Sequence, residues 1–179
     1  MSDVQRNLWR GVVAGAVGGL AASWVMNQFI AGPGKELQAA VETNGVKQKD
    51  DQNQQRDGEP KEDATMKAAD AVVNVATGGG HLSKEEKKQA GPVVHYAFGA
   101  VMGGVYGGLA EYSSGVTSGF GTTFGSMLFG GADVLAVPLL GLSPLPSKDD
   151  SVKLVSPFAA HVVYGVTTEF VRRIVRAIL

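Results

Sequence analysis

The sequence predicts an all-helical membrane protein, a bundle of four transmembrane helices with glycine-rich packing stripes. Three observations lead to this fold class. Three stretches contain no charged residue, at 11–34, 89–110 and 112–132. Glycine accounts for 25 of the 179 residues and gathers in these stretches. A polar segment, 35–89, separates the first stretch from the other two. Since a bilayer core needs about 20 mostly apolar helical residues, each uncharged stretch is long enough to cross it.

The first membrane helix is predicted over residues 8–30, because the apolar run ends at Gly32-Pro33-Gly34. A cleaved signal peptide is the alternative, since positive charge followed by an apolar run is its pattern. The run is long for a signal sequence, and no clear cleavage site of small residues stands at its end. These features favour a retained helix.

Three further membrane helices are predicted in the C-terminal half, over 92–110, 119–140 and 156–174. Pro92 and Pro157 suit the first position of a helix, where the missing N–H has no helical partner. The last helix carries charged residues in its final turns. This is compatible with a membrane helix, because arginines near a helix end can place their guanidinium groups at the membrane surface. The whole chain, 1–179, is therefore interpreted as one membrane domain.

The segment 35–89 is predicted to lie mostly outside the membrane. Its centre, 47–61, is poor in apolar residues and is predicted to be irregular. Asp63 would cap a helix that ends at the glycines after Thr77. Ser83 and Glu86 have the spacing of a capping box, which predicts a short helix towards Gln89. The first of these helices is amphipathic, so it would lie on the membrane surface or pack on the end of the bundle.

Glycines recur at intervals of four within the apolar helices, the pattern of a glycine zipper. Such spacing forms one smooth stripe on a helix, against which a neighbouring backbone packs closely. We interpret the stripes as contacts within the bundle, and contacts between copies or a pore lined by backbone are the alternatives. The predicted packing positions are Gly15, Gly19, Gly99, Gly103, Gly107, Gly121 and Gly125.

Four titratable residues in apolar helices are candidates for handling protons or ions: Asp133, His95, His161 and Glu169. A carboxylate in mid-membrane is costly, which makes Asp133 a candidate functional residue by default. Histidine changes charge near neutral pH. Structural alternatives are a neutral Asp133 bonded to its neighbours, histidines at the membrane surface, and an ion pair between Glu169 and the arginines one turn later.

Several classes of function lack support in the sequence. It contains no phosphate-binding loop of the Walker type and no Gly-x-Ser-x-Gly motif. No spacing of histidines and carboxylates is specific for a metal. The chain has no cysteine, and its net charge of −1 gives no sign of nucleic-acid binding. We therefore expect no enzymatic activity, no cofactor and no metal.

Residues 92–176 resemble the YagU family of bacterial inner-membrane proteins. The resemblance is carried by Val105–Glu111, by Val137–Pro144, and by the spacing of His161, Glu169 and Arg172-Arg173. It implies a small multi-helix protein of the cytoplasmic membrane with no established activity. The chain departs from the family pattern in its longer polar segment after the first helix. It also departs at Asp133, where the family pattern leads us to expect a polar or titratable residue such as histidine. The aspartate keeps a titratable group and changes the sign of its charge.

The leading hypothesis is a membrane protein with a structural or stress-related role, acid stress included, or an accessory subunit of a larger complex. The alternative is a proton-linked channel or transporter, or a pH-responsive protein, that uses Asp133, His95 and His161. Its partners would be the lipid bilayer and further membrane subunits, identical or different. The arginines near the ends of the chain favour cytoplasmic termini in a bacterial inner membrane: Arg6, Arg10, Arg172, Arg173 and Arg176. Lysines near the helix ends on the opposite side leave the reverse orientation open: Lys35, Lys84, Lys87, Lys88, Lys148 and Lys153.

Overall fold

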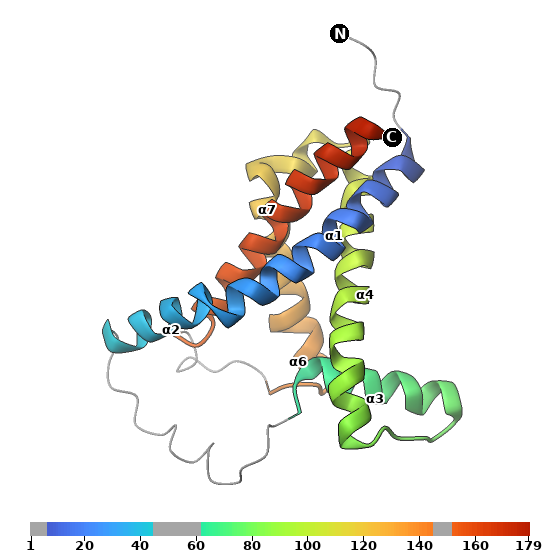
Figure 1. Ribbon diagram of the computed structural model, residues 1–179, viewed down its shortest axis with the longest axis vertical. Coiled ribbons are helices and arrows are strands. Elements are labelled where there is room, and N and C mark those ends of the chain that lie inside the picture. The colour runs from blue at the N-terminus through green and yellow to red at the C-terminus, as the bar shows by residue number, and fades with distance from the viewer. Residues whose placement is uncertain (1–6, 45–61, 145–151) are drawn as a thin grey trace.

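The computed structural model describes residues 7–44, 62–144 and 152–179, and within these ranges the chain forms helices with no strand (Figure 1). The N-terminal elements are α1 (Leu8–Ala31), α2 (Pro33–Asn44), α3 (Ala64–Thr77) and α4 (Lys84–Ala110). They are followed by η1 (Ser114–Gly121), α5 (Thr122–Leu128), η2 (Phe129–Ala136), α6 (Val137–Leu139) and α7 (Val155–Ile178). The predicted all-helical class is confirmed. Residues 47–61, which were predicted to be irregular, lie outside the described residues.

Three helical segments in the described part of the chain are long and apolar enough to cross a membrane: Leu8–Ala31, Lys84–Ala110 and Ser114–Leu139. The third is interrupted near its start, because Ser118 to Phe120 leave helical geometry. Its regular part therefore begins at Thr122, after the left-handed Gly121. α7 is not among the three, and four charged residues stand in its second half.

α4 is longer than the helix predicted from Pro92, because it begins at Lys84 and continues through the proline. The short helix expected after Ser83 is its first part. Both halves of the capping box are present, since Ser83 accepts from the Glu86 N–H and the Glu86 carboxylate accepts from the Ser83 N–H. α3 packs against this part of α4. At the buried Gly91, an added Cβ would lie 3.2 Å from Cγ of Met66 in α3.

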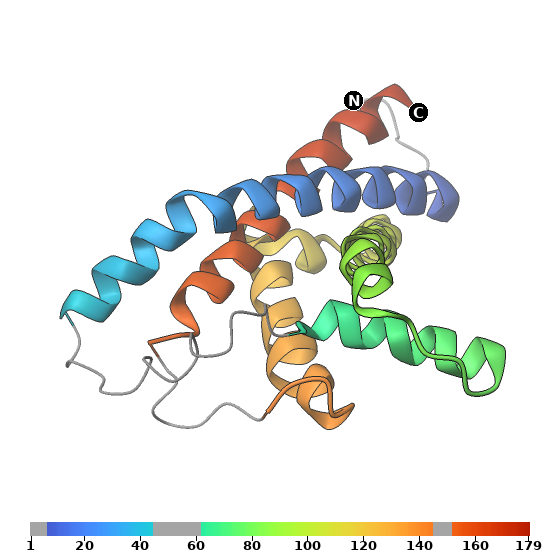
Figure 2. The ribbon, with the colours of Figure 1, turned by 60° about the horizontal axis from the view of Figure 1, so that its bottom comes forward.

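α1 lies between α4 and α7 and packs against both (Figure 2). The backbones of α1 and α4 approach closely along a line of buried glycines. A Cβ added at Gly103 would stand 2.8 Å from Cα of Gly19, and one at Gly107 would stand 2.7 Å from Cα of Gly15. A small core joins α1, α5 and α7, and its buried members are Ala22, Met26, Leu128, Ala160 and Tyr164.

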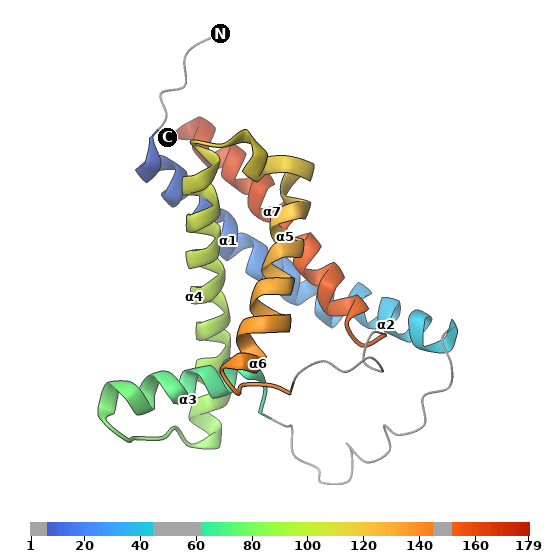
Figure 3. The same cartoon turned by 180° about the vertical axis from the view of Figure 1, so that it is seen from behind.

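The two ends of the molecule differ in character (Figures 1 and 3). The start of α1, the end of α4, η1 and the end of α7 lie together at what we call the arginine end. This end carries the exposed aromatic residues Trp9, Tyr112 and Phe120. Its four described arginines are Arg10, Arg172, Arg173 and Arg176. The opposite end, which we call the α3 end, holds α3, α6 and the start of α7.

Candidate functional site

Asp133 and His161 face each other across the contact between η2 and α7. Nε2 of His161 lies 3.7 Å from a carboxylate oxygen of Asp133, within ion-pair range but beyond a hydrogen bond. Nδ1 of His161 lies 2.9 Å from the Pro157 carbonyl oxygen and must donate to it, because a carbonyl only accepts. This bond orients the imidazole and turns Nε2 towards the carboxylate. The His161 side chain is 9% exposed, whereas that of Asp133 is 44% exposed.

Asp133 is carried by an unusual stretch of helix. η2 is a π-helix, in which Val137 N–H bonds to the Ala132 carbonyl five residues back. Pro138 follows, and its nitrogen has no hydrogen to continue the normal helical pattern. π-helical turns are rare and are found frequently at functional sites. The wider turn alters the direction of each side chain relative to a regular α-helix, so the position of Asp133 could not be read from helical spacing.

His95 is the third member of the cluster and comes from α4. It interacts electrostatically with His161 and Asp133, and also with Asp63, which caps α3. Its Nε2 is buried and has no hydrogen-bond partner among the described residues. A buried polar atom without a partner is uncommon and needs an explanation in structure or function. We refer to Asp133, His161 and His95 as the His–Asp cluster.

Glu169 does not join this cluster. It lies further along α7, is fully buried, and receives hydrogen bonds from three side chains. Tyr106 donates to it at 2.8 Å, Arg172 donates twice at 2.7 and 3.0 Å, and Arg173 donates at 2.6 Å. The helical ion pair expected from the spacing therefore forms. Tyr106 was not anticipated, because it stands on another helix, 63 residues away in sequence.

A second carboxylate at the arginine end ties three helices together. Glu111 follows α4 and accepts from Arg176 of α7 at 2.6 and 2.9 Å. It also accepts from the backbone N–H of Asn7, which caps α1. The Arg176 guanidinium holds the pKa of Glu111 below its ordinary value of 4.5, and the Asn7 N–H acts in the same direction.

At the α3 end, Asp70 fixes the turn between α3 and α4. Its carboxylate lies 3.0 Å from Nδ1 of His81 and accepts from the Leu82 N–H at 2.7 Å. The His81 hydrogen bond and then the Leu82 N–H lower the pKa of Asp70 below its ordinary value of 3.8. This arrangement stands apart from the His–Asp cluster. In the described ranges, no three His, Cys, Asp or Glu residues are grouped as a metal site would require.

The predicted packing glycines lie at two helix contacts. Gly15 and Gly19 of α1 face Gly99, Gly103 and Gly107 of α4, and all five are buried. Gly121 and Gly125 lie against α7 instead. A Cβ added at Gly121 would stand 2.7 Å from the carbonyl carbon of Gly165, and one at Gly125 would stand 2.9 Å from that of His161.

The profile of a family described as "Protein of unknown function (DUF1440)" matches residues 66–170, more than half of the chain. The chain belongs to this family. DUF1440 is the YagU-like family, so the resemblance noted above is confirmed at the level of the family. No curated protein and no solved structure matches the chain.

The DUF1440 region contains the whole His–Asp cluster and Glu169. It leaves out α1 and the arginines that follow position 170. The family description names no activity, and the membrane-like helices fit a membrane protein of the DUF1440 family. The geometry of the residues within this region is therefore the basis for a function.

Proposed function

We propose that the protein is a multi-pass protein of the bacterial inner membrane, in which α7 is the fourth span beside the three apolar segments. α7 has 24 residues and packs along α1 and α5. Its charged residues point largely inward, since Glu169 is 0% exposed and Arg172 is 8% exposed. Such inward pairing makes charges tolerable at membrane depth. The arginines favour a cytoplasmic location for the start of α1 and the end of α7. Under the same rule, lysines near the opposite helix ends favour the reverse orientation: Lys35, Lys84, Lys87, Lys88 and Lys153. We adopt the first orientation as part of this proposal.

The function that the site supports best is a response to pH, in which the His–Asp cluster takes up and releases protons. One observation carries this proposal: His161 of α7 and Asp133 of η2 come within ion-pair range although the sequence separates them widely. Histidine and a carboxylate at this distance change their mutual interaction when either one changes charge. The cluster would exchange protons and would perform no covalent chemistry, so the role is non-enzymatic and needs no cofactor.

The position of the cluster favours proton exchange with the side of the membrane at the α3 end. His161 is six residues from the start of α7, or about 9 Å at 1.5 Å per residue. The apolar core around Leu128 and Tyr164 lies between the cluster and the buried Glu169. The hydroxyls of this layer, on Tyr164 and Thr168, each donate to a backbone carbonyl, at 2.6 and 2.8 Å, and neither bond links the cluster to Glu169. Apolar packing around them opposes continuous proton transfer across the bundle. The arrangement therefore favours a pH-responsive protein over an open channel.

A double-mutant cycle on Asp133 and His161 tests this function. The free energy of unfolding in mild detergent is measured at pH 5 and pH 8 for the parent, Asp133→Asn, His161→Gln and the double variant. We expect a coupling energy of about 0.2–1 kcal/mol that changes between the two pH values, because attraction requires both groups to be charged. The same cycle on Asp133 and His81, a histidine that pairs with Asp70 instead, is the control, and its coupling energy should be close to zero at both pH values. An identical coupling energy at both pH values would rule out titration of this pair.

A flux measurement separates the pH-responsive protein from the transporter. The parent and Asp133→Asn are reconstituted in liposomes that contain a pH-sensitive dye, and a pH gradient is applied. The pH-responsive function predicts the same slow leak in both preparations. A flux in the parent that Asp133→Asn abolishes, with the variant still inserted, would instead establish the proton-linked transporter.

A structural or accessory-subunit role is the second candidate, and the line of glycines between α1 and α4 favours it. We propose that this line is a packing seam that brings two spans into backbone contact, as in other membrane helix pairs. Gly103→Leu would push a side chain against Gly19 and should prevent assembly. Gly130→Leu, at a glycine whose Cβ would meet nothing within 4 Å, is the matched control. Mass determination after mild-detergent purification reads out assembly and any partner subunits that copurify.

A further inference from the structure

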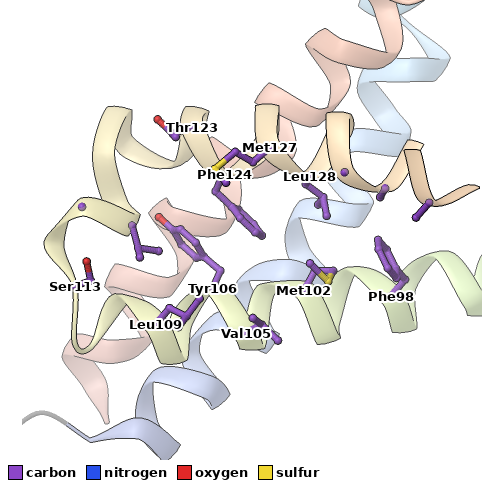
Figure 4. A pocket seen from close by; sticks show the side chains of 15 residues that line it. Phe98, Met102, Val105, Tyr106, Leu109, Ser113, Thr123, Phe124, Met127 and Leu128 are labelled. Carbon is purple, nitrogen blue, oxygen red and sulfur yellow. The ribbon is translucent and has the colours of Figure 1, made fainter. Parts of the chain in front are cut away.

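An apolar groove lies between α4 and the second long limb of the molecule, formed by α5, η2 and α6 (Figure 4). At the arginine end η1 joins the two limbs, and the rings of Tyr106 and Phe124 stack between them, with centroids 4.4 Å apart. The groove has a volume of about 660 Å³, within the range of sites that bind small organic ligands. Its walls include Phe98, Met102 and Val105 on one side and Phe124, Met127 and Leu128 on the other.

The residues that η2 contributes to the groove have small side chains. Gly131 and Ala132 are among them, and a Cβ added at Gly131 would meet nothing within 4 Å. Both limbs belong to segments that are apolar enough to cross a membrane. The groove is therefore presented to the hydrocarbon layer, where an occupant must be apolar.

An excess of positive charge lies behind Tyr106, a residue that lines the groove. Tyr106 donates to Glu169, which is shared by Arg172 and Arg173, so two guanidiniums face one carboxylate. The Arg173 side chain is 54% exposed, and its guanidinium lies over the ring of Phe120 in η1, 4.7 Å from the centroid. Gly115 and Val116, also in η1, line the groove. The partly exposed Arg173 thus lies beside η1, the element that lines one end of the apolar groove.

We propose that this groove binds an anionic phospholipid, with one acyl chain between the two limbs and the phosphate group at Arg173. The charge at η1 matches a negative headgroup, and the uncharged walls match a hydrocarbon chain. Basic sites between spans on the cytoplasmic side are known to select acidic lipids in this way. The lipid would fill the groove, so that α4 and the α5–α6 limb move as one unit.

Native mass spectrometry of the full-length protein tests the proposal. Delipidated protein in detergent is titrated with palmitoyl-oleoyl phosphatidylglycerol and, separately, with the matching phosphatidylcholine. We expect one phosphatidylglycerol to bind about fivefold more tightly than phosphatidylcholine, the contribution of one arginine near the membrane surface. Arg173→Gln should remove this preference, and Arg173→Lys should retain it.

Substitutions at two neighbouring glycines form a matched pair that tests where the acyl chain binds. Gly131→Leu fills the groove and should weaken binding of both lipids about tenfold. Gly130→Leu makes the same change in equally open space, at a position that does not line the groove, and should bind both lipids as the parent does. Circular dichroism and gel filtration check that both variants are folded.

Three outcomes would overturn the proposal. The first is equal affinity of the parent for the two lipids. The second is equal lipid binding by Gly131→Leu and Gly130→Leu. The third is a delipidated parent that forms a dimer which Gly131→Leu dissociates, because a second copy of the chain would then occupy the groove.

Discussion

Glu169 has no exposed surface, and both of its oxygens accept charge-assisted or hydroxyl hydrogen bonds. A buried carboxylate is stable only when it is paired and its remaining lone pairs are satisfied. Arg172, which is also buried, makes the two-point contact, whereas Arg173 is half exposed and adds less. Tyr106 provides the remaining bond and links this centre to α4.

Removal of the Tyr106 hydroxyl should destabilise the protein at this centre. Tyr106→Phe leaves the ring stacked on Phe124, with centroids 4.4 Å apart, but deprives Glu169 of one donor. We expect a loss of about 2 kcal/mol in the free energy of unfolding, the usual range for a hydrogen bond to a charged group. Tyr112→Phe, at an exposed tyrosine, should change it by less than about 0.5 kcal/mol. Equal effects of the two substitutions would contradict this account.

Acid should weaken the contact at Glu111. Its pKa is lowered in the folded protein, so its contribution to stability is present above 4.5 and is lost as the pH falls through the folded value. We therefore expect the unfolding midpoint of the parent to fall more steeply below pH 4.5 than that of Glu111→Gln. Thermal unfolding between pH 7 and pH 3 measures both curves, and parallel curves would show that the Arg176 contact is not linked to pH.

Among the elements, α4 is long enough to extend beyond the hydrocarbon core of a membrane. Its 27 residues extend about 40 Å, more than the 30 Å of a hydrocarbon core. The turns that begin at Lys84 therefore project beyond the core, where α3 packs on them. The capping box at Ser83 secures this projecting part, which lacks the glycine contacts that hold the rest of α4.

Ser83→Ala should therefore loosen the start of α4 without disturbing its span. Loss of an N-cap costs about 1 kcal/mol, and amide exchange should speed up in the first two turns of α4 and in α3. Ser113→Ala is the matched control, since Ser113 precedes η1 and makes no side-chain capping bond. Its amide exchange should equal that of the parent.

Most helices and caps in this chain were predictable, because they depend on neighbouring residues. α2 was not predicted, since Gly32-Pro33-Gly34 was interpreted as the end of helical structure, whereas a helix begins at Pro33. Uncharged runs located the long helices, Asp63 and Ser83 marked helix starts, and both caps form. The start predicted at Pro92 differs from the observed one because the charged turns from Lys84 pack against α3 outside the apolar run. Local pattern identifies the apolar part of a helix and does not reveal polar extensions held by other elements.

The candidate site was predictable only in part. Asp133, His95 and His161 stand out as titratable residues in apolar runs, which needs no three-dimensional information. Their convergence depends on the π-helical turn of η2 and on how α4, η2 and α7 pack. The bond between Tyr106 and Glu169 is likewise set by packing between helices. Neither the phase of a π-helix nor the rotation of packed helices is encoded in a recognisable spacing.

At the scale of the whole molecule, the proposed four spans predict which loops share a side of the membrane. The chain has no cysteine, so a single introduced cysteine reports its own position. Ser113→Cys at the arginine end and Ile178→Cys in the last turn of α7 should react with an impermeant thiol reagent from the same side. Val75→Cys in α3 should react from the opposite side. If Ile178→Cys reacted from the same side as Val75→Cys, α7 would not cross the membrane.

The pairing of Glu169 with arginines also governs how the chain is made. An isolated α7 would enter the bilayer with its charges unshielded, and each charged residue near the centre of a span opposes insertion by roughly 2.5–3.5 kcal/mol. Two of its partners, Tyr106 and Glu111, are synthesised earlier, on or just after α4. The last helix should therefore leave the translocon only after α4 is in place to receive it, so that biosynthesis ends with the burial of these charges.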